Sequence, residues 1–239
     1  MIRVIAPALR HPTNRDLDEF HRYWAENHGP LYARTKALRR YVQHLTIKEA
    51  YDWDPRPSFD GASMFWFDDI GPMLNPEADA EAAALNAAVM ADDAQLFDRS
   101  PGWPLHHKRA SVIGNERVVL EGDTSPDMVK GIFIVSRKPG LSLQEFSDHW
   151  FEVHGPLIAQ VPGIRRYVQT HALPEAYVTS GMMGITHDGF SELWFDDPAA
   201  LHAAMASPEW AAAKDDGATL FAEPAAFVAG RERVQKGWL

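Results

Sequence analysis

F-x-x-x-W-x-x-x-H-G-P-L, the stretch from residue 20 to residue 31, occurs a second time at residues 146–157. Each copy leads into the identical string R-R-Y-V-Q, which spans 39–43 and 165–169. The register is constant, since 146 minus 20 and 165 minus 39 both give 126. A motif repeated in register over this length indicates a tandem duplication, so we expect two copies of one structural unit.

Each copy of the motif predicts a helix, over 16–27 and 142–153. In the first copy Phe20, Trp24 and His28 follow one another at intervals of four residues, and the second copy keeps this spacing. Side chains at this spacing share one broad helix face. The Gly-Pro pair after the histidine predicts a helix end followed by a new segment, because glycine closes helices and proline favours a first helical turn.

The segments around the motif also recur in the same order. Short β-branched runs at 1–9 and 129–136 are typical of strands. The other predicted elements are second strands (39–47 and 165–173), third strands (58–67 and 187–195), alanine-rich helices (77–91 and 198–214) and fourth strands (108–120 and 225–234). Each copy therefore reads strand, helix, strand, strand, helix, strand, which is the ferredoxin-like order.

The predicted fold class is α+β, with two ferredoxin-like (βαββαβ) units fused in tandem. We expect residues 1–122 to form the first unit and 127–239 the second, with the polar stretch 121–127 as the linker. A four-stranded sheet with both helices on one face leaves its other face apolar and open. The two sheets are therefore expected to pack face to face as an intramolecular dimeric α+β barrel.

The composition excludes several classes of protein. With 46% hydrophobic and 23% charged residues the chain is globular rather than disordered. A net charge of -10 argues against nucleic-acid and anionic-membrane partners. The absence of cysteine removes disulfides and thiolate chemistry. No apolar run approaches the ~20 residues of a membrane span, and no signal peptide is recognisable, so we expect a cytoplasmic location.

The repeated histidines, His28 and His154, are the first candidates for chemistry. A histidine that titrates near neutral pH is a suitable general acid or base, and a helix C-terminus would favour its protonated form. The alternative is structural, with the ring capping the last carbonyls of the helix. Trp24 and Trp150, midway along the same helix face, are expected mainly to pack in the core, and to form a cleft wall as the alternative.

The motif followed by R-x-Y-x-Q resembles the EthD family of dimeric α+β barrel proteins, and the resemblance covers both halves of the chain. It implies small enzymes without cofactors, such as lactone isomerases, polyketide dehydratases or decarboxylases, and proteins of ether or aromatic catabolism. For the site, it implies that His28 and His154, with Tyr41 and Tyr167 from the second strands, line a cleft between sheet and helices. A tyrosine hydroxyl there would polarise a carbonyl or protonate an enolate.

The two copies differ on the second strand. Strand alternation places Tyr167, Gln169 and His171 on one side of the second copy, where the first copy has Tyr41 and then Leu45. The second copy thus gains an imidazole beside its tyrosine. His44 of the first copy points to the opposite side, which predicts a surface or interface position.

The third strands differ as well, because Glu192 replaces Met64. We predict that His154, Tyr167, His171 and Glu192 converge in one polar cleft, which makes the second half the better candidate for chemistry. The alternative is that His171 and Glu192 face solvent at a sheet edge. The residues predicted to contact a substrate are aromatic or amide side chains near these positions: Phe146, Trp150, Gln169, Trp194, Trp24 and Trp66.

No metal or cofactor is expected. The sequence contains no H-E-x-x-H or H-x-x-E-H spacing, and no glycine-rich nucleotide motif. A metal site would require ligands that are distant in the sequence to converge in the fold.

The leading functional hypothesis is a cofactor-independent enzyme that acts on a hydrophobic, oxygenated small molecule such as a phenolic, a lactone or a polyketide-like acid. Decarboxylation, dehydration or isomerisation would proceed by proton transfer at histidine and tyrosine. One alternative is a non-catalytic binding or accessory protein of a catabolic pathway, and another is a cofactor-free monooxygenase. The fused barrel is also a candidate for pairing with a second copy.

Overall fold

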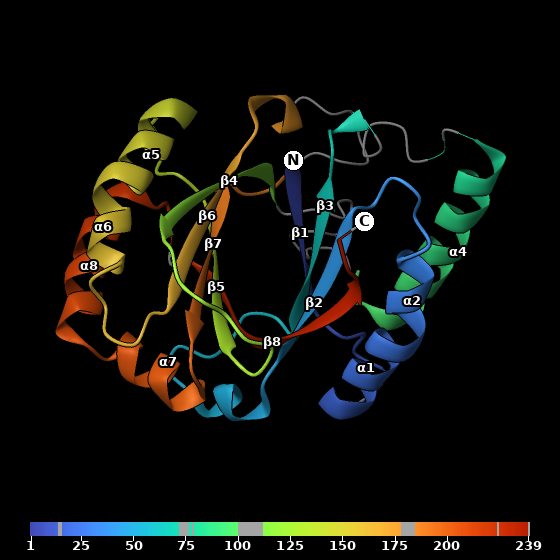
Figure 1. The fold of residues 1–239 in the computed structure, drawn as a ribbon, viewed down its shortest axis with the longest axis horizontal. Coiled ribbons are helices and arrows are strands. Elements are labelled where there is room, and N and C mark those ends of the chain that lie inside the picture. Colours follow the sequence, from blue (N-terminus) through green and yellow to red (C-terminus); the bar gives the residue numbers. More distant parts are fainter. Residues whose placement is uncertain are drawn as a thin grey trace.

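Eight antiparallel strands, four from each half of the sequence, close into one barrel with helices on its outside (Figure 1). The computed structural model describes residues 1–13, 16–71, 77, 79–99, 112–177, 185–223 and 225–238. The strands are β1 (Ile2–Ala8), β2 (Arg40–Thr46), β3 (Gly61–Phe67), β4 (Val112–Leu120), β5 (Val129–Val135), β6 (Arg166–Ala172), β7 (Gly189–Phe195) and β8 (Ala226–Lys236). The predicted fold class, a fused dimeric α+β barrel, is confirmed.

The strand order β1-β3-β2-β8-β5-β7-β6-β4 shows how the halves are joined. Each fourth strand lies between the first strand of its own half and the second strand of the other half, so β8 pairs with β2 and β4 pairs with β6. Glycines permit the close approach at both seams. A Cβ on Gly114 would lie 2.1 Å from the His171 carbonyl oxygen, and a Cβ on Gly230 would lie 2.9 Å from that of Leu45.

The helices lie in two groups on opposite sides of the barrel, one for each half (Figure 1). The first group is α1 (Leu17–Tyr23), a π-helical turn (Trp24–His28), α2 (Gly29–Tyr32) and α4 (Ala80–Leu96). The second group is α5 (Leu143–His149), a π-helical turn (Trp150–His154), α6 (Gly155–Ile158), α7 (Pro198–Met205) and α8 (Pro208–Leu220). None of the helices in the described ranges has both the length and the apolar character needed to cross a membrane.

The prediction that each motif helix ends at its histidine is wrong. Gly29 and Gly155 have right-handed helical angles, with φ of -57° and -54°, and the chain continues through the π-helical turn into the next helix. Pro30 and Pro156 are compatible with this path because they occupy the first turn of that helix, where a backbone N–H is not required. His28 and His154 therefore lie inside a continuous helical segment.

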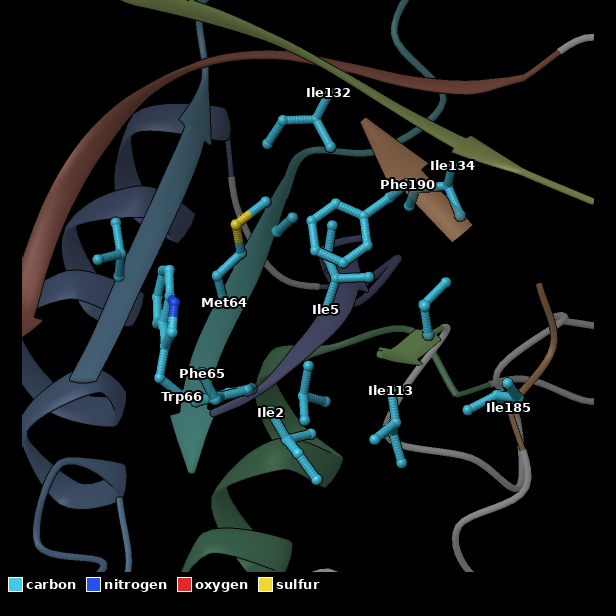
Figure 2. Packing of buried hydrophobic residues seen from close by; sticks show 14 of the residues in the cluster. Ile2, Ile5, Met64, Phe65, Trp66, Ile113, Ile132, Ile134, Ile185 and Phe190 are labelled. Atoms are coloured by element: carbon cyan, nitrogen blue, oxygen red, sulfur yellow. The ribbon is translucent and has the colours of Figure 1, made fainter. Parts of the chain in front are cut away.

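The interior of the barrel is lined by alternate residues of the strands of both halves. Figure 2 shows Ile5 of β1, Met64 of β3, Ile132 of β5 and Phe190 of β7 with side chains directed toward a common centre. The remaining residues of each strand face the helices, so every strand contributes to two separate cores. Any functional side chain on a strand thus belongs either to the barrel interior or to the layer between sheet and helices.

Candidate functional site

A pocket lies between the sheet and the helices of the first half. Its volume is about 40 Å³. The lining residues come from β1, the motif helix, β3 and the end of α4, and they are Ala6, Pro7, Ala8, Trp24, His28, Tyr32, Ser63, Phe65, Asp93, Phe97 and Arg99. The walls are thus mainly apolar and partly aromatic, with a small number of polar groups, which is the usual composition of a small-molecule site.

His28 is the titratable ring of this pocket, and carboxylates hold it on two sides. Its Nδ1 is 2.7 Å from Asp92 Oδ2, and its Nε2 is 3.5 Å from Asp93 Oδ1. Asp92 also accepts a hydrogen bond of 2.7 Å from the Tyr23 hydroxyl. The edge of the His28 ring packs against Phe97 at 5.3 Å between ring centroids. Carboxylate and aromatic contacts together fix the orientation of the imidazole.

Tyr41 lies behind the pocket rather than on its surface. Its side chain is 0% exposed, and its hydroxyl is 3.1 Å from Ser63 Oγ, which does line the pocket. Gln43 Nε2 donates to the same hydroxyl at 3.0 Å. Burial raises the pKa of Tyr41 above its ordinary value, so the hydroxyl is protonated at neutral pH. Tyr41 is thus linked to the pocket by its hydrogen bond to Ser63.

In the second half His154 has a different set of partners. Its Nδ1 is 3.0 Å from Asp216 Oδ2, while the other oxygen of Asp216 is 2.9 Å from His149 Nε2. Gly217 stands where the first half has Asp93, so the second carboxylate has no counterpart. Burial lowers the pKa of His154 despite the neighbouring Asp216. The expectation that a helix end would favour the protonated ring is therefore wrong for His154.

His171 and Tyr167 are brought together as expected, through Gln169. The Gln169 amide donates to the Tyr167 hydroxyl at 2.6 Å, and its carbonyl oxygen is 3.0 Å from His171 Nε2. His171 Nδ1 is 2.7 Å from Ser147 Oγ, and the ring lies 4.6 Å from that of Trp150. Burial, with a smaller contribution from the Arg117 charge, lowers the pKa of His171 to about 3. This chain of polar groups is buried and satisfied internally.

Glu192 does not join this cluster, which corrects the predicted convergence. In the pairing of β6 with β7, Glu192 lies opposite Val168, whereas Tyr167 lies opposite Leu193. Its side chain, 0% exposed, thus enters the barrel interior, where it forms ion pairs with Arg3 and Lys130. The alternative of a solvent-facing Glu192 is equally wrong.

The charge of Glu192 is set by its neighbours. Burial by itself would raise the pKa of this carboxyl, but the charges of Arg3, Lys130 and His44 outweigh it and lower the pKa to about 2. Met64, which occupies the matching position of the first half, also contacts Arg3, at 3.6 Å from Nη2 to Sδ. One carboxylate therefore serves two buried cations, one from the first strand of each half.

His44 belongs to the same interior cluster, where it contacts Lys130 and Glu232 of the second half, so of the two predicted positions the surface is wrong and the interface between the halves agrees. The ligand atoms of His44, Glu192 and Glu232 lie within 4.8 Å of one another, a spacing that a metal ion would fit. The Lys130 ammonium is placed among them, 2.6 Å from Glu192 Oε1 and 3.2 Å from His44 Nε2, and it also pairs with Glu232. An internal cation thus occupies the position that the ligand geometry suggests for a metal.

The residues predicted to contact a substrate divide between the two layers. Trp24 lines the first-half pocket. Phe146 and Trp150 pack against each other at 5.4 Å in the second half, and Gln169 belongs to the polar chain described above. Trp66 and Trp194 face the barrel interior instead, where Arg3 and Lys130 lie over their rings. These two tryptophans are therefore not part of a cleft between sheet and helices.

Several residues of the pocket are not predicted from the sequence, namely Tyr32, Ser63, Asp93 and Arg99, and neither is Asp92, which binds His28. A signal for the two aspartates exists, because both Ala-rich helices end in an Asp-Asp pair followed by Leu-Phe. When the two helices are aligned on the Leu-Phe pair, Asp92 matches Asp216. These two aspartates bind the two histidines. Arg3, Lys130 and Glu232 of the interior cluster were missed because their partners lie on strands remote in the sequence.

Comparisons with known proteins agree with this architecture. The model of the EthD domain matches the chain twice, at residues 13–100 and 138–224. An EthD-family protein of Bacillus halodurans is 28% identical over 44% of this chain and 99% of its own, with a TM-score of 0.37. An anthrone oxidase-like protein is 14% identical, with coverage of 100% and 94% and a TM-score of 0.58, which shows a shared fold. No curated protein matches the chain.

Proposed function

The chain belongs to the EthD family, and on that premise we propose that it is a cofactor-independent enzyme that moves protons on a hydrophobic, oxygenated small molecule. The reaction would be a decarboxylation, a dehydration or an isomerisation. We assign the chemistry to the first half, although the sequence had favoured the second.

The observation that carries the proposal is His28 at the wall of an aromatic pocket with Asp92 bound to its Nδ1. A carboxylate accepts hydrogen bonds, so Nδ1 carries a proton, and Nε2, which is 3.5 Å from Asp93 Oδ1, is the atom that would exchange a proton with Asp93 or with a substrate. An imidazole oriented in this way is a suitable general base, and as imidazolium it is a general acid. Ser63 adds a hydroxyl that is backed by the protonated Tyr41.

The second half supports the assignment by contrast. His171 and Tyr167 already have partners inside the protein, and His154 lacks a counterpart of Asp93. Burial lowers the pKa of both His154 and His171, which favours the neutral form of these two rings. We propose that this half mainly supports the fold.

The test compares His28→Asn with His154→Asn, the same change at matching positions of the repeat. An asparagine amide retains a donor toward the aspartate but has no acid–base function. Turnover would be measured on lactones, β-keto acids and phenolic carboxylic acids, in air and under argon. We expect turnover to fall by about 100-fold or more in His28→Asn, because general acid–base catalysis contributes 10²–10⁴-fold. His154→Asn is expected to retain most of the activity.

Full turnover by a folded His28→Asn would overturn the assignment. Activity that requires oxygen would indicate the monooxygenase alternative, and a ligand recovered unchanged would indicate a binding protein. Pairing of the fused barrel with a second copy remains a prediction, which sedimentation velocity decides.

A further inference from the structure

A chain of hydrogen bonds runs from the last strand toward the first-half pocket, and it begins with two glutamine amides. Gln235 of β8 donates from Nε2 to the Ala25 carbonyl oxygen at 2.9 Å and to Gln43 Oε1 at 2.7 Å. Gln43 in turn donates from Nε2 to the Trp24 carbonyl oxygen at 3.0 Å and to the Tyr41 hydroxyl at 3.0 Å. A backbone carbonyl can only accept a hydrogen bond, so Ala25 and Trp24 fix which end of each amide is the donor.

The hydroxyl hydrogen of Tyr41 is therefore directed to Ser63. The Tyr41 oxygen already accepts from the Gln43 amide, and the side chain is 0% exposed. Within the described part of the chain, Ser63 Oγ at 3.1 Å is the acceptor in reach of this hydrogen. A buried donor without an acceptor costs about 1–3 kcal/mol, so Tyr41 donates and Ser63 accepts. The hydrogen of Ser63 is then available to a further acceptor.

The strand pairing places the pocket on the other side of Ser63. On β3, Ser63 lies opposite Gln43 of β2 in one ladder and opposite Ala6 of β1 in the other. Ala6 and Ser63 both line the pocket, whereas Gln43 belongs to the chain of hydrogen bonds behind it. The Ser63 hydroxyl thus has Tyr41 on one side and the pocket, next to the small side chain of Ala6, on the other.

The matching position of the second half has a larger neighbour. Ser191 matches Ser63, and its partner on β5 is Phe133, where Ser63 has Ala6 on β1. The Phe133 ring packs against Trp210 of α8 at 5.3 Å between ring centroids. An aromatic ring therefore takes the place of the Ala6 methyl group in the layer between sheet and helices.

The hydrogen bonds behind the two serines differ as well. Among the described residues, the Tyr167 hydroxyl accepts from Gln169 and makes no hydrogen bond to Ser191. Tyr41, by contrast, is bonded to Ser63. Ser191 thus has the same place in the repeat without the tyrosine contact, which makes it a matched control for Ser63.

We infer that Ser63 determines the specificity of the first-half pocket by donating its hydroxyl hydrogen to a carbonyl oxygen of the substrate. The inference rests on the proposed function of His28, which lines the same pocket. Under that function a proton next to the carbonyl passes to the imidazole, the C–H electron pair forms a C=C bond, and the carbonyl π electrons move to oxygen. Ser63 then donates to the enolate oxygen. The imidazolium returns the proton to carbon, so no oxidant or reductant is consumed.

The test measures the affinity of two small probes by NMR titration of the full chain. A single water requires about 10–15 Å³, so a pocket of about 40 Å³ receives the carbonyl end of a molecule and calls for small probes. Cyclobutanone carries the carbonyl oxygen, and in methylenecyclobutane a CH₂ group replaces it. We expect Ser63→Ala to weaken the binding of cyclobutanone by roughly 2- to 10-fold, the contribution of one neutral hydrogen bond, and to leave methylenecyclobutane nearly unchanged. Ser191→Ala should affect neither probe.

Ala6→Phe, which introduces the residue of the second half, shows where the probes bind. It should weaken the binding of both probes, because the new ring fills the space beside Ser63. Unchanged binding of both probes to Ala6→Phe would place them elsewhere and overturn the inference.

The donor role of Ser63 would also be overturned by equal effects of Ser63→Ala on the two probes, by no effect on cyclobutanone, or by a lack of cyclobutanone binding to the unmodified protein. The titration measures binding alone, so its result is independent of the turnover comparison between His28→Asn and His154→Asn. Binding that depends on the carbonyl and on Ser63, without turnover that depends on His28, would retain the carbonyl site and reject the proposed enzyme.

Discussion

The two halves of this protein hold the same histidine on the same π-helical turn, but they surround it differently. His28 faces a pocket and has two carboxylates beside its ring. His154 shares one carboxylate with His149, and Gly217 replaces the second. The repeat therefore determines where the ring is placed. What the ring can do depends on helix residues outside the repeated motif.

The barrel interior gives a second comparison, between Met64 and Glu192 at matching positions. The carboxylate pairs with Arg3 from the first half and with Lys130 from the second. Two carboxylates at this place would repel each other, and two methionines would leave Arg3 with Glu116 and Lys130 with Glu232, both of which are partly exposed. The replacement of methionine by Glu192 thus links the two halves through ion pairs. It does not add a catalytic group to the second half.

The largest effect is expected from Glu192→Met, which makes the third strands alike. Arg3 and Lys130 would lose their shared buried partner and keep Glu116 and Glu232, which are partly exposed, so the expected cost is near the lower end of the about 3–5 kcal/mol for breaking a buried ion pair. The free energy of unfolding would be measured by urea denaturation. Asp196→Asn, which breaks the exposed pair with Arg165, is the control and should cost less than about 1 kcal/mol.

The double variant Arg3→Met/Glu192→Met tests the cause, because it removes one cation together with the carboxylate. We expect it to be more stable than Glu192→Met alone. A loss below about 1 kcal/mol in Glu192→Met would contradict a role of this side chain in joining the halves.

An intermediate effect is expected from His171→Leu, which introduces the residue of the first half. The pKa of His171 is lowered from 6.5 to about 3 in the folded protein. Below pH 6.5 the unfolded chain therefore binds a proton that the native protein does not, and stability falls as the pH drops toward 3. At pH 5 this loss is up to about 2 kcal/mol.

The variant should lose this part of the acid sensitivity. The quantity to compare is the change in unfolding free energy between pH 7 and pH 5, because the new leucine also removes the partner of Ser147 Oγ and of Gln169 Oε1 and so lowers stability at every pH. An identical change in variant and unmodified protein would show that His171 is not the titrating group.

The smallest effect concerns the helix starts. Ser142 and Glu145 form a reciprocal capping box at α5, and at α1 the Asp16 side chain accepts a hydrogen bond from the Glu19 backbone N–H. Ser142→Ala should cost about 1 kcal/mol, the usual value for an N-cap. Thermal unfolding of Ser142→Ala and Asp16→Ala would measure the two caps, and a similar loss for both would show that the second hydrogen bond adds little.

The sequence predicts the closed barrel well, because the repeat, the strand alternation and the Phe-Trp-His spacing all follow local periodicity. It fails for Glu192, since the face on which this side chain lies depends on its pairing with Val168 rather than on its own strand. It also fails at Gly29, because a π-helical turn allows the helix to continue where glycine and proline usually end one.

The candidate site was predicted only in part. His28 and Trp24 belong to the repeated motif and were selected for that reason. Asp92, Asp93 and Arg99 come from the end of α4 and the residues after it, far along the chain, and tertiary packing brings them to the histidine. The preference for the second half followed from counting polar residues, which does not reveal whether His171 is already bonded internally.

The seam between β2 and β8 has a consequence for how the protein is made. β2 ends at Thr46, and its partner β8 begins at Ala226, so 226 minus 46, or 180 positions, separate them along the chain. On the ribosome the first half therefore emerges with an unpaired strand edge that only the last strand can cover. Such an edge is a template for pairing with other chains. Premature termination before β8 would leave this edge permanently open.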